Sequence, residues 1–115
     1  MYQVSYAEVL DDAPKQNRDR ERRAIERSID LLRAAEPTGT GSRESAEALL
    51  FVRQLWTVFV EDLAQPDNDL PQKLRADLIS IGLWVMREIE NIRMEKTPSF
   101  KDLIEVSQLI AEGLK

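Results

Sequence analysis

The 115-residue sequence contains no cysteine and no histidine. Without cysteine the chain has no disulfide framework, no thiol nucleophile and no thiolate metal site. Without histidine it lacks the usual general base near neutral pH and the commonest metal ligand. These absences argue against zinc, haem and Ser-His-Asp chemistry. The sequence therefore predicts a protein that is not an enzyme and that uses no cofactor and no metal.

The sequence also lacks a net positive charge, since 16 Lys and Arg residues are outnumbered by 21 Asp and Glu residues and the net charge is −5. Proteins that bind nucleic acid neutralise phosphates with basic side chains, which this balance opposes. The one basic concentration, residues 15–23, is interleaved with Asp19 and Glu21, a pattern typical of a salt-bridged helix surface. Direct binding to nucleic acid is therefore not expected.

No apolar run approaches the roughly 20 residues that a membrane-spanning helix needs. The opening segment MYQVSYAEVLDD has neither a basic region nor a long apolar stretch, so it does not resemble a secretory signal. Apolar residues make up 43% of the chain and charged residues 32%, a composition typical of globular proteins. We expect a single cytoplasmic domain over residues 1–115, with no membrane contact.

Turn-forming residues divide the chain into four expected helices, about 14–36, 43–64, 71–95 and 100–113, after an N-terminal arm over residues 1–13. Asp12 and Pro14 are start signals for the first helix. The arm itself fits either an extended segment or a short helix over about 5–11. Because the connections are short, neighbouring helices are expected to be antiparallel. The predicted fold is an all-α bundle.

The helix over 43–64, with Ser42 as its expected N-cap, is the most apolar. Its main apolar face has helical spacing and consists of Leu49, Val52, Trp56, Phe59, Val60 and Leu63. A second stripe, Phe51, Leu55 and Val58, widens the apolar arc beyond the usual ~100°. We therefore expect this helix at the centre of the bundle, in contact with more than one neighbour.

The helix over 71–95 also carries two apolar stripes. The first consists of Leu74, Leu78, Ile81, Val85, Ile89 and Ile92, and the second of Ile79, Leu83 and Met86 together with Gly82. Glycine in mid-helix costs about 1 kcal/mol relative to alanine, and a close approach between helices at Gly82 would explain it.

Two further features have a structural and a functional interpretation. Trp56 and Trp84 fit core packing better than binding anchors, since aromatic side chains contribute most when they are buried. The segment from Asp67 to Asp69 resembles the opening of a calcium loop. However, Leu78 stands where that loop needs glutamate, so a turn between helices is the preferred interpretation.

Several segments in colinear order resemble the FlaF family of flagellar biosynthesis regulators. They are MYQVSYAEVL, RERRAIERSIDLL, SAEALLFVRQLWTVFVEDLA, LPQKLRADLISIGLWVMREIENIR and LIEVSQLIAEGL, with residues 51–64 and 74–90 as the most specific parts. The resemblance implies a small cytoplasmic protein that is needed for flagellin production and filament assembly and works beside the regulator FlbT. It also implies binding to flagellin in the manner of a secretion chaperone. No family site residues can be transferred by position.

The resemblance further implies that the partner, flagellin, has amphipathic terminal helices, whose apolar stripes would be exposed before export. A helical partner with spare apolar surface can bind such a helix in a groove. The candidate partner-binding residues are Phe51, Leu55 and Val58, then Ile79, Leu83 and Met86, and the arm residues Tyr2, Tyr6 and Leu10 as a lid. Two alternatives are a regulator that acts on flagellin mRNA, alone or with FlbT, and a structural homodimeric adaptor.

Overall fold

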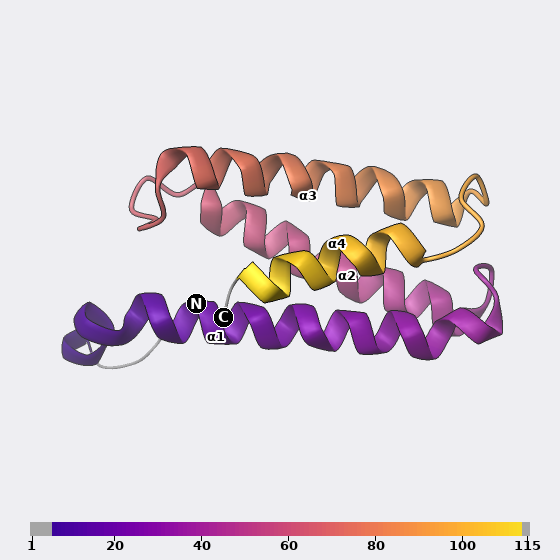
Figure 1. The fold of residues 1–115 in the computed structure, drawn as a ribbon, viewed down its shortest axis with the longest axis horizontal. Coiled ribbons are helices and arrows are strands. Elements are labelled where there is room, and N and C mark those ends of the chain that lie inside the picture. Colours follow the sequence, from indigo (N-terminus) through magenta and orange to yellow (C-terminus); the bar gives the residue numbers. More distant parts are fainter. Residues whose placement is uncertain (1–5, 114–115) are drawn as a thin grey trace.

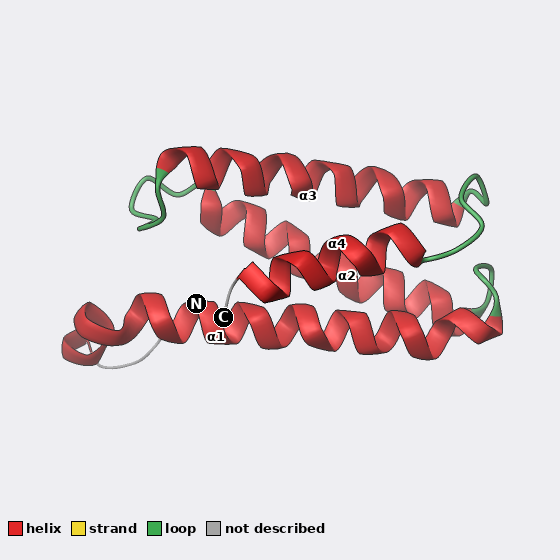
Figure 2. Cartoon of the chain, in the orientation of Figure 1, coloured by secondary structure: helices red, strands yellow, loops and turns green. Residues whose placement is uncertain are grey.

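The structure, a computed structural model, describes the backbone of residues 6–113 and the side chains of residues 19–113. The helices of this range are α1 (Tyr6–Ala35), a short 3-10 helix η1 (Glu36–Thr38), α2 (Arg43–Leu63), α3 (Gln72–Arg93) and α4 (Lys101–Gly113) (Figure 1). Figure 2 shows that loops and turns make up the rest of the described backbone. The predicted all-α fold is confirmed.

Successive α-helices run in opposite directions and form an elongated bundle with dimensions of 47 × 24 × 21 Å (Figure 1). α1 packs against both α2 and α4, while α3 packs mainly against α2. In the view of Figure 1, α2 lies behind and α4 in front, between α1 and α3. None of the helices in the described part of the chain is both long enough and apolar enough to cross a bilayer.

The bounds of α2, α3 and α4 lie within two residues of the predicted ones, but the start predicted for the first helix, about residue 14, is wrong. Residues 6–13, assigned to an arm, belong to α1, so the helical alternative for the arm has the right conformation but is not a separate helix. Pro14 lacks the N–H of an interior helical residue, which makes it a common first-turn residue. An interior proline loses one hydrogen bond and crowds the carbonyl four residues earlier, yet α1 runs through Pro14. Ala7, Leu10 and Ala13 favour the helix on its N-terminal side.

The core consists of apolar side chains from all four α-helices. The second half of α1 buries the predicted stripe of Ile25, Ile29, Leu32 and Ala35, while α4 contributes Phe100 just before its first residue and Leu103 within it. The other core residues are Ala48, Leu49, Val52, Trp56, Phe59, Leu63, Leu78, Val85, Ile89, Ile92, Ile104 and Ala111. The predicted central position of α2 follows from its packing against both α1 and α3.

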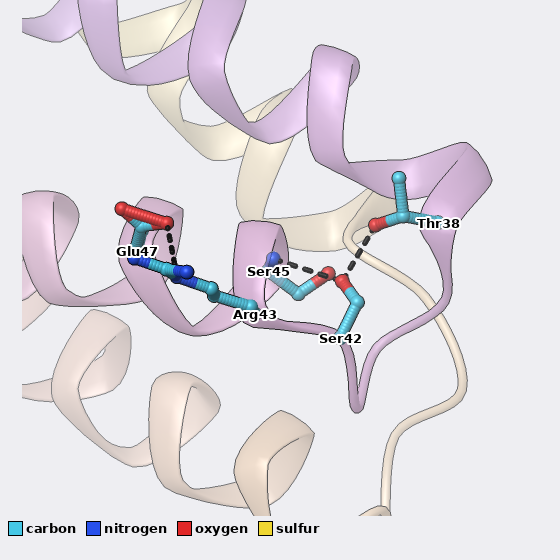
Figure 3. Close-up of polar contacts among 5 residues, drawn as sticks. All are labelled: Thr38, Ser42, Arg43, Ser45 and Glu47. Carbon is cyan, nitrogen blue, oxygen red and sulfur yellow. Dashed lines mark hydrogen bonds and ion pairs between the residues drawn. The ribbon is translucent and has the colours of Figure 1, made fainter.

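Local hydrogen bonds hold the connection between α1 and α2 (Figure 3). The Ser42 hydroxyl accepts from the backbone N–H of Ser45 at 3.0 Å, which confirms Ser42 as the N-cap of α2. The hydroxyls of Thr38 and Ser42 also hydrogen-bond to each other, so η1 is tied to the first turn of α2. This corner fixes where α2 begins relative to α1.

The connection between α3 and α4 lies at the same end of the bundle (Figure 1). Glu95 has a positive φ of 59°, and the N–H of Lys96 donates to the carbonyl of Asn91 at 2.8 Å, a Schellman ending for α3. The Glu36 carboxylate accepts from the N–H of Phe100 at 3.3 Å. This hydrogen bond attaches η1 to the start of α4, where a negative charge is favourable.

Candidate partner-binding surface

Two sides of α2 have similar apolar character but different surroundings. We call Trp56 and Val60, which meet α3, the closed flank. A Cβ atom built on Gly82 of α3 would lie 2.6 Å from Val60 Cγ2 and 3.1 Å from Trp56 Cε3. The predicted close approach at Gly82 is therefore confirmed, since a larger residue there would force Val60 or its helix to shift.

Trp56 is fully buried, and its ring packs at a tilt against Phe59 with centroids 5.2 Å apart. Its indole N–H has no hydrogen-bond partner among the described residues. Trp56 therefore stabilises the protein through packing, which has to offset the cost of burying this N–H. Trp84 is partly buried and packs against the same core, in agreement with its predicted structural role.

The predicted stripe of Phe51, Leu55 and Val58 forms the other side of α2, which we call the open flank. At 100° per residue, Val58 lies roughly 160° around the helix from Val60, so this flank points away from α3. Phe51 is half-buried and Leu55 packs against the edge of the core, while 65% of Val58 is exposed. Only part of this stripe is available to a partner.

The candidate residues on α3 divide in the same way. Ile79 and Met86 pack against the core, whereas Leu83 is 53% exposed. Because α3 covers the closed flank of α2, the α3 stripe and the open flank do not join into one groove. The two candidate surfaces are separate.

The arm residues proposed as a lid cannot be placed against either surface. Tyr2 lies outside the described residues, and the side chains of Tyr6 and Leu10 lie outside the described side chains, although both residues are in α1. Their role stays a prediction.

Four exposed apolar residues were not among the predicted partner-binding residues. They are Leu50 on α2, Leu74 on α3, Met94 at the end of α3 and Leu109 on α4. Leu50 carried a usable signal, since it lies eight residues before Val58 and therefore on nearly the same side of the helix. It was missed because it stands outside the stripe that runs through Phe51 and Leu55.

The C-terminal end of α2 is acidic. Burial raises the pKa of the Asp62 carboxyl, and the nearby carboxylates of Asp67 and Asp69 raise it further. Asn68 donates to the backbone carbonyl of Asp62 at 3.1 Å and accepts from the N–H of Leu70 at 3.0 Å, so this segment is an ordered turn between helices. Among the described residues no group of three or more acidic side chains is placed to hold a metal ion.

The basic segment of α1, residues 15–23, contains acidic and basic side chains that interact where the side chains are described, from residue 19 onward. Arg22 pairs with Asp19 at 3.5 Å. Arg20 and Glu21 also have partners of their own. This arrangement supports the interpretation of a salt-bridged helix surface.

Comparison with known families gives one match over almost the whole sequence. The family model described as flagellar protein FlaF matches residues 2–114. Comparison with curated proteins yields no match, and comparison with solved structures yields none either.

Proposed function

The chain belongs to the FlaF family of flagellar proteins, and on that premise we propose that it binds flagellin in the cytoplasm as a chaperone-like partner. In this role it would couple flagellin synthesis to export and filament assembly. The observation that carries the proposal is the apolar surface that remains after the core is complete. Leu50 and Val58 on α2 and Leu83 on α3 are each more than half exposed.

Such residues fit the binding of a helix. The amphipathic terminal helices that the family resemblance implies for flagellin expose an apolar stripe until the filament forms. A partner helix with exposed apolar side chains at helical spacing can cover that stripe and suppress aggregation. Because the exposed residues lie on helices whose opposite faces pack into the core, the surface is formed before flagellin binds, which limits the entropic cost of binding.

Charge supports a protein guest over RNA. The net charge of −5 repels phosphate, and Asp19 and its neighbours offset the basic part of α1. If the isolated protein changed the electrophoretic mobility of flagellin leader RNA in a salt-dependent way, this result would favour the alternative of direct action on flagellin mRNA. If the protein acts on the mRNA through FlbT, the mobility of the RNA should change only when FlbT is also present.

The proposal is tested by mixing the purified full-length protein with purified flagellin monomer and measuring the complex by isothermal titration calorimetry. We expect a 1:1 complex, and we expect flagellin to aggregate more slowly when the protein is present. A matched variant with Val58→Glu and Leu83→Glu should fold normally, because both side chains are exposed, and should lose most of the affinity. Absence of binding by the unaltered protein would contradict the proposal.

A further inference from the structure

Five exposed residues of α2 form a strip along the side that faces away from the bundle. The strip consists of Glu47, Leu50, Gln54, Val58 and Glu61. Their spacing of three, four, four and three residues is that of a helix seam, and it places all five within about 80° of the helix circumference. We call this set the outer strip.

The outer strip is symmetric in residue type about its central residue, Gln54. Leu50 and Val58, exposed by 53% and 65%, lie four residues on either side of Gln54. Glu47 and Glu61 lie seven residues on either side of it. An apolar centre is therefore bounded at both ends by a carboxylate, and Arg43 continues the same side of the helix one turn before Glu47.

This arrangement opposes a second copy of the chain as the occupant. In an antiparallel pair centred on Gln54, Leu50 would meet Val58 of the other copy, but Glu47 would meet Glu61 at both ends. In a parallel pair each glutamate would meet its own counterpart. Either pairing puts like charges together at both ends of the apolar contact, which is unfavourable.

The acidic ends are only weakly neutralised within the chain. Arg43 lies 3.5 Å from Glu47, but both side chains are largely exposed, so the pair contributes little. Glu61 has no ion pair among the described residues. Glu61 is thus directly available to a basic partner, and Glu47 can exchange its exposed pair with Arg43 for one.

We infer that the outer strip binds a helix with two apolar residues seven or eight positions apart and a Lys or Arg about one turn beyond each of them. The apolar pair covers Leu50 and Val58, and the basic residues pair with Glu47 and Glu61. Charge complementarity fixes the register of the guest, since a shift by one turn leaves a carboxylate against an apolar side chain. This inference rests on the proposed function and specifies which kind of helical segment the protein selects.

The test titrates the isotope-labelled full-length protein with two synthetic helical peptides and follows its backbone amide signals. Both peptides carry leucines seven residues apart, and they differ only in having lysine or glutamate one turn outside each leucine. We expect the lysine peptide to shift signals of residues 47–61 and to bind at least tenfold more tightly than the glutamate peptide. Added salt should reduce this difference. Equal binding of both peptides, or shifts confined to α3, would overturn the inference.

Variants separate the outer strip from other exposed apolar sites. Val58→Glu should weaken binding of the lysine peptide at least tenfold, and the double variant Glu47→Lys, Glu61→Lys should reverse the preference between the peptides. Leu109→Glu on α4 is the matched control, since Leu109 is 73% exposed and lies on another helix. It should leave binding unchanged. A protein that is dimeric by light scattering and becomes monomeric with Val58→Glu would overturn the inference in favour of a second copy.

The peptide experiment does not depend on flagellin, so the two proposals can fail separately. Flagellin binding that survives Val58→Glu but is lost with Leu83→Glu would overturn the inference and leave the proposed function standing. Binding of the lysine peptide without any binding of flagellin would support the outer strip and contradict the proposed function.

Discussion

The closed and open flanks of α2 show that apolar character alone does not decide burial. Trp56 and Val58 are two residues apart on the same helix, yet Trp56 is fully buried and Val58 is 65% exposed. The difference comes from α3, which meets the closed flank where Gly82 lets it approach. α1 and α3 pack against two sides of α2, and Leu50 and Val58 stay exposed on a third side.

The largest expected change in stability comes from comparing one substitution on each flank. Trp56→Ala should lower the free energy of unfolding by about 4 kcal/mol, because it leaves a large cavity in a closed core. Val58→Ala should change it by less than about 0.5 kcal/mol, since the side chain is mostly exposed. Urea denaturation of both variants checks this. Similar losses in the two variants would mean that the flanks do not differ as described.

The close approach of α3 is tested by Gly82→Ala. The added methyl group would overlap Val60, and we expect a net loss of about 2 kcal/mol even though alanine favours the helix by about 1 kcal/mol. Gly113→Ala is the control, because a Cβ there has no neighbour within 4 Å. Thermal unfolding should show a stable Gly113→Ala protein and a weakened Gly82→Ala protein; a stabilised Gly82→Ala protein would show that α3 is free to move.

Arg75 gives a polar test of the same α2–α3 contact. Its guanidinium donates to the carbonyl oxygens of Leu63 and Gln65, at 3.5 and 3.1 Å, which lie at and just beyond the C-terminal end of α2. Arg75→Ala should cost about 1 kcal/mol, as expected for the loss of hydrogen bonds to helix-end carbonyls. Arg87→Ala, at an exposed position of α3, should have almost no effect. Equal urea midpoints for the two variants would contradict this role for Arg75.

The smallest effect concerns Asp62, which continues the open flank one turn beyond Val58. Because its pKa is raised in the folded protein, the ionised carboxylate disfavours folding above that pKa, and the penalty disappears as the pH falls below the unfolded value of about 3.9. Asp62→Asn should therefore stabilise the protein at pH 7, by less than about 0.5 kcal/mol given its partial exposure. The gain should vanish near pH 3. Denaturation at both pH values provides the measurement, and a gain of equal size at pH 3 would exclude the electrostatic explanation.

Much of the fold could be predicted because its signals are local. Ser42 caps α2 through a hydrogen bond to a residue three positions away, and the turn at Asn68 is held by contacts within six residues. The predicted start of α1 is wrong because proline is common in the first turn of a helix and rare in its interior, where Pro14 lies. The candidate surface was predicted only in part, because Leu55, Ile79 and Met86 have the same apolar spacing as the exposed Val58 and Leu83.

The sequence by itself determined the helical class of this protein, the ends of α2, α3 and α4, and the set of apolar stripes, since each depends on spacing and capping within a few residues. Only the tertiary structure decided which stripes are buried. Burial depends on which helices pack against each other. Trp56 and Val60 face α3 because Gly82 lets that helix approach them closely. Within the open flank Val58 is exposed while Leu55 packs against the core, a difference of packing that no local pattern contains.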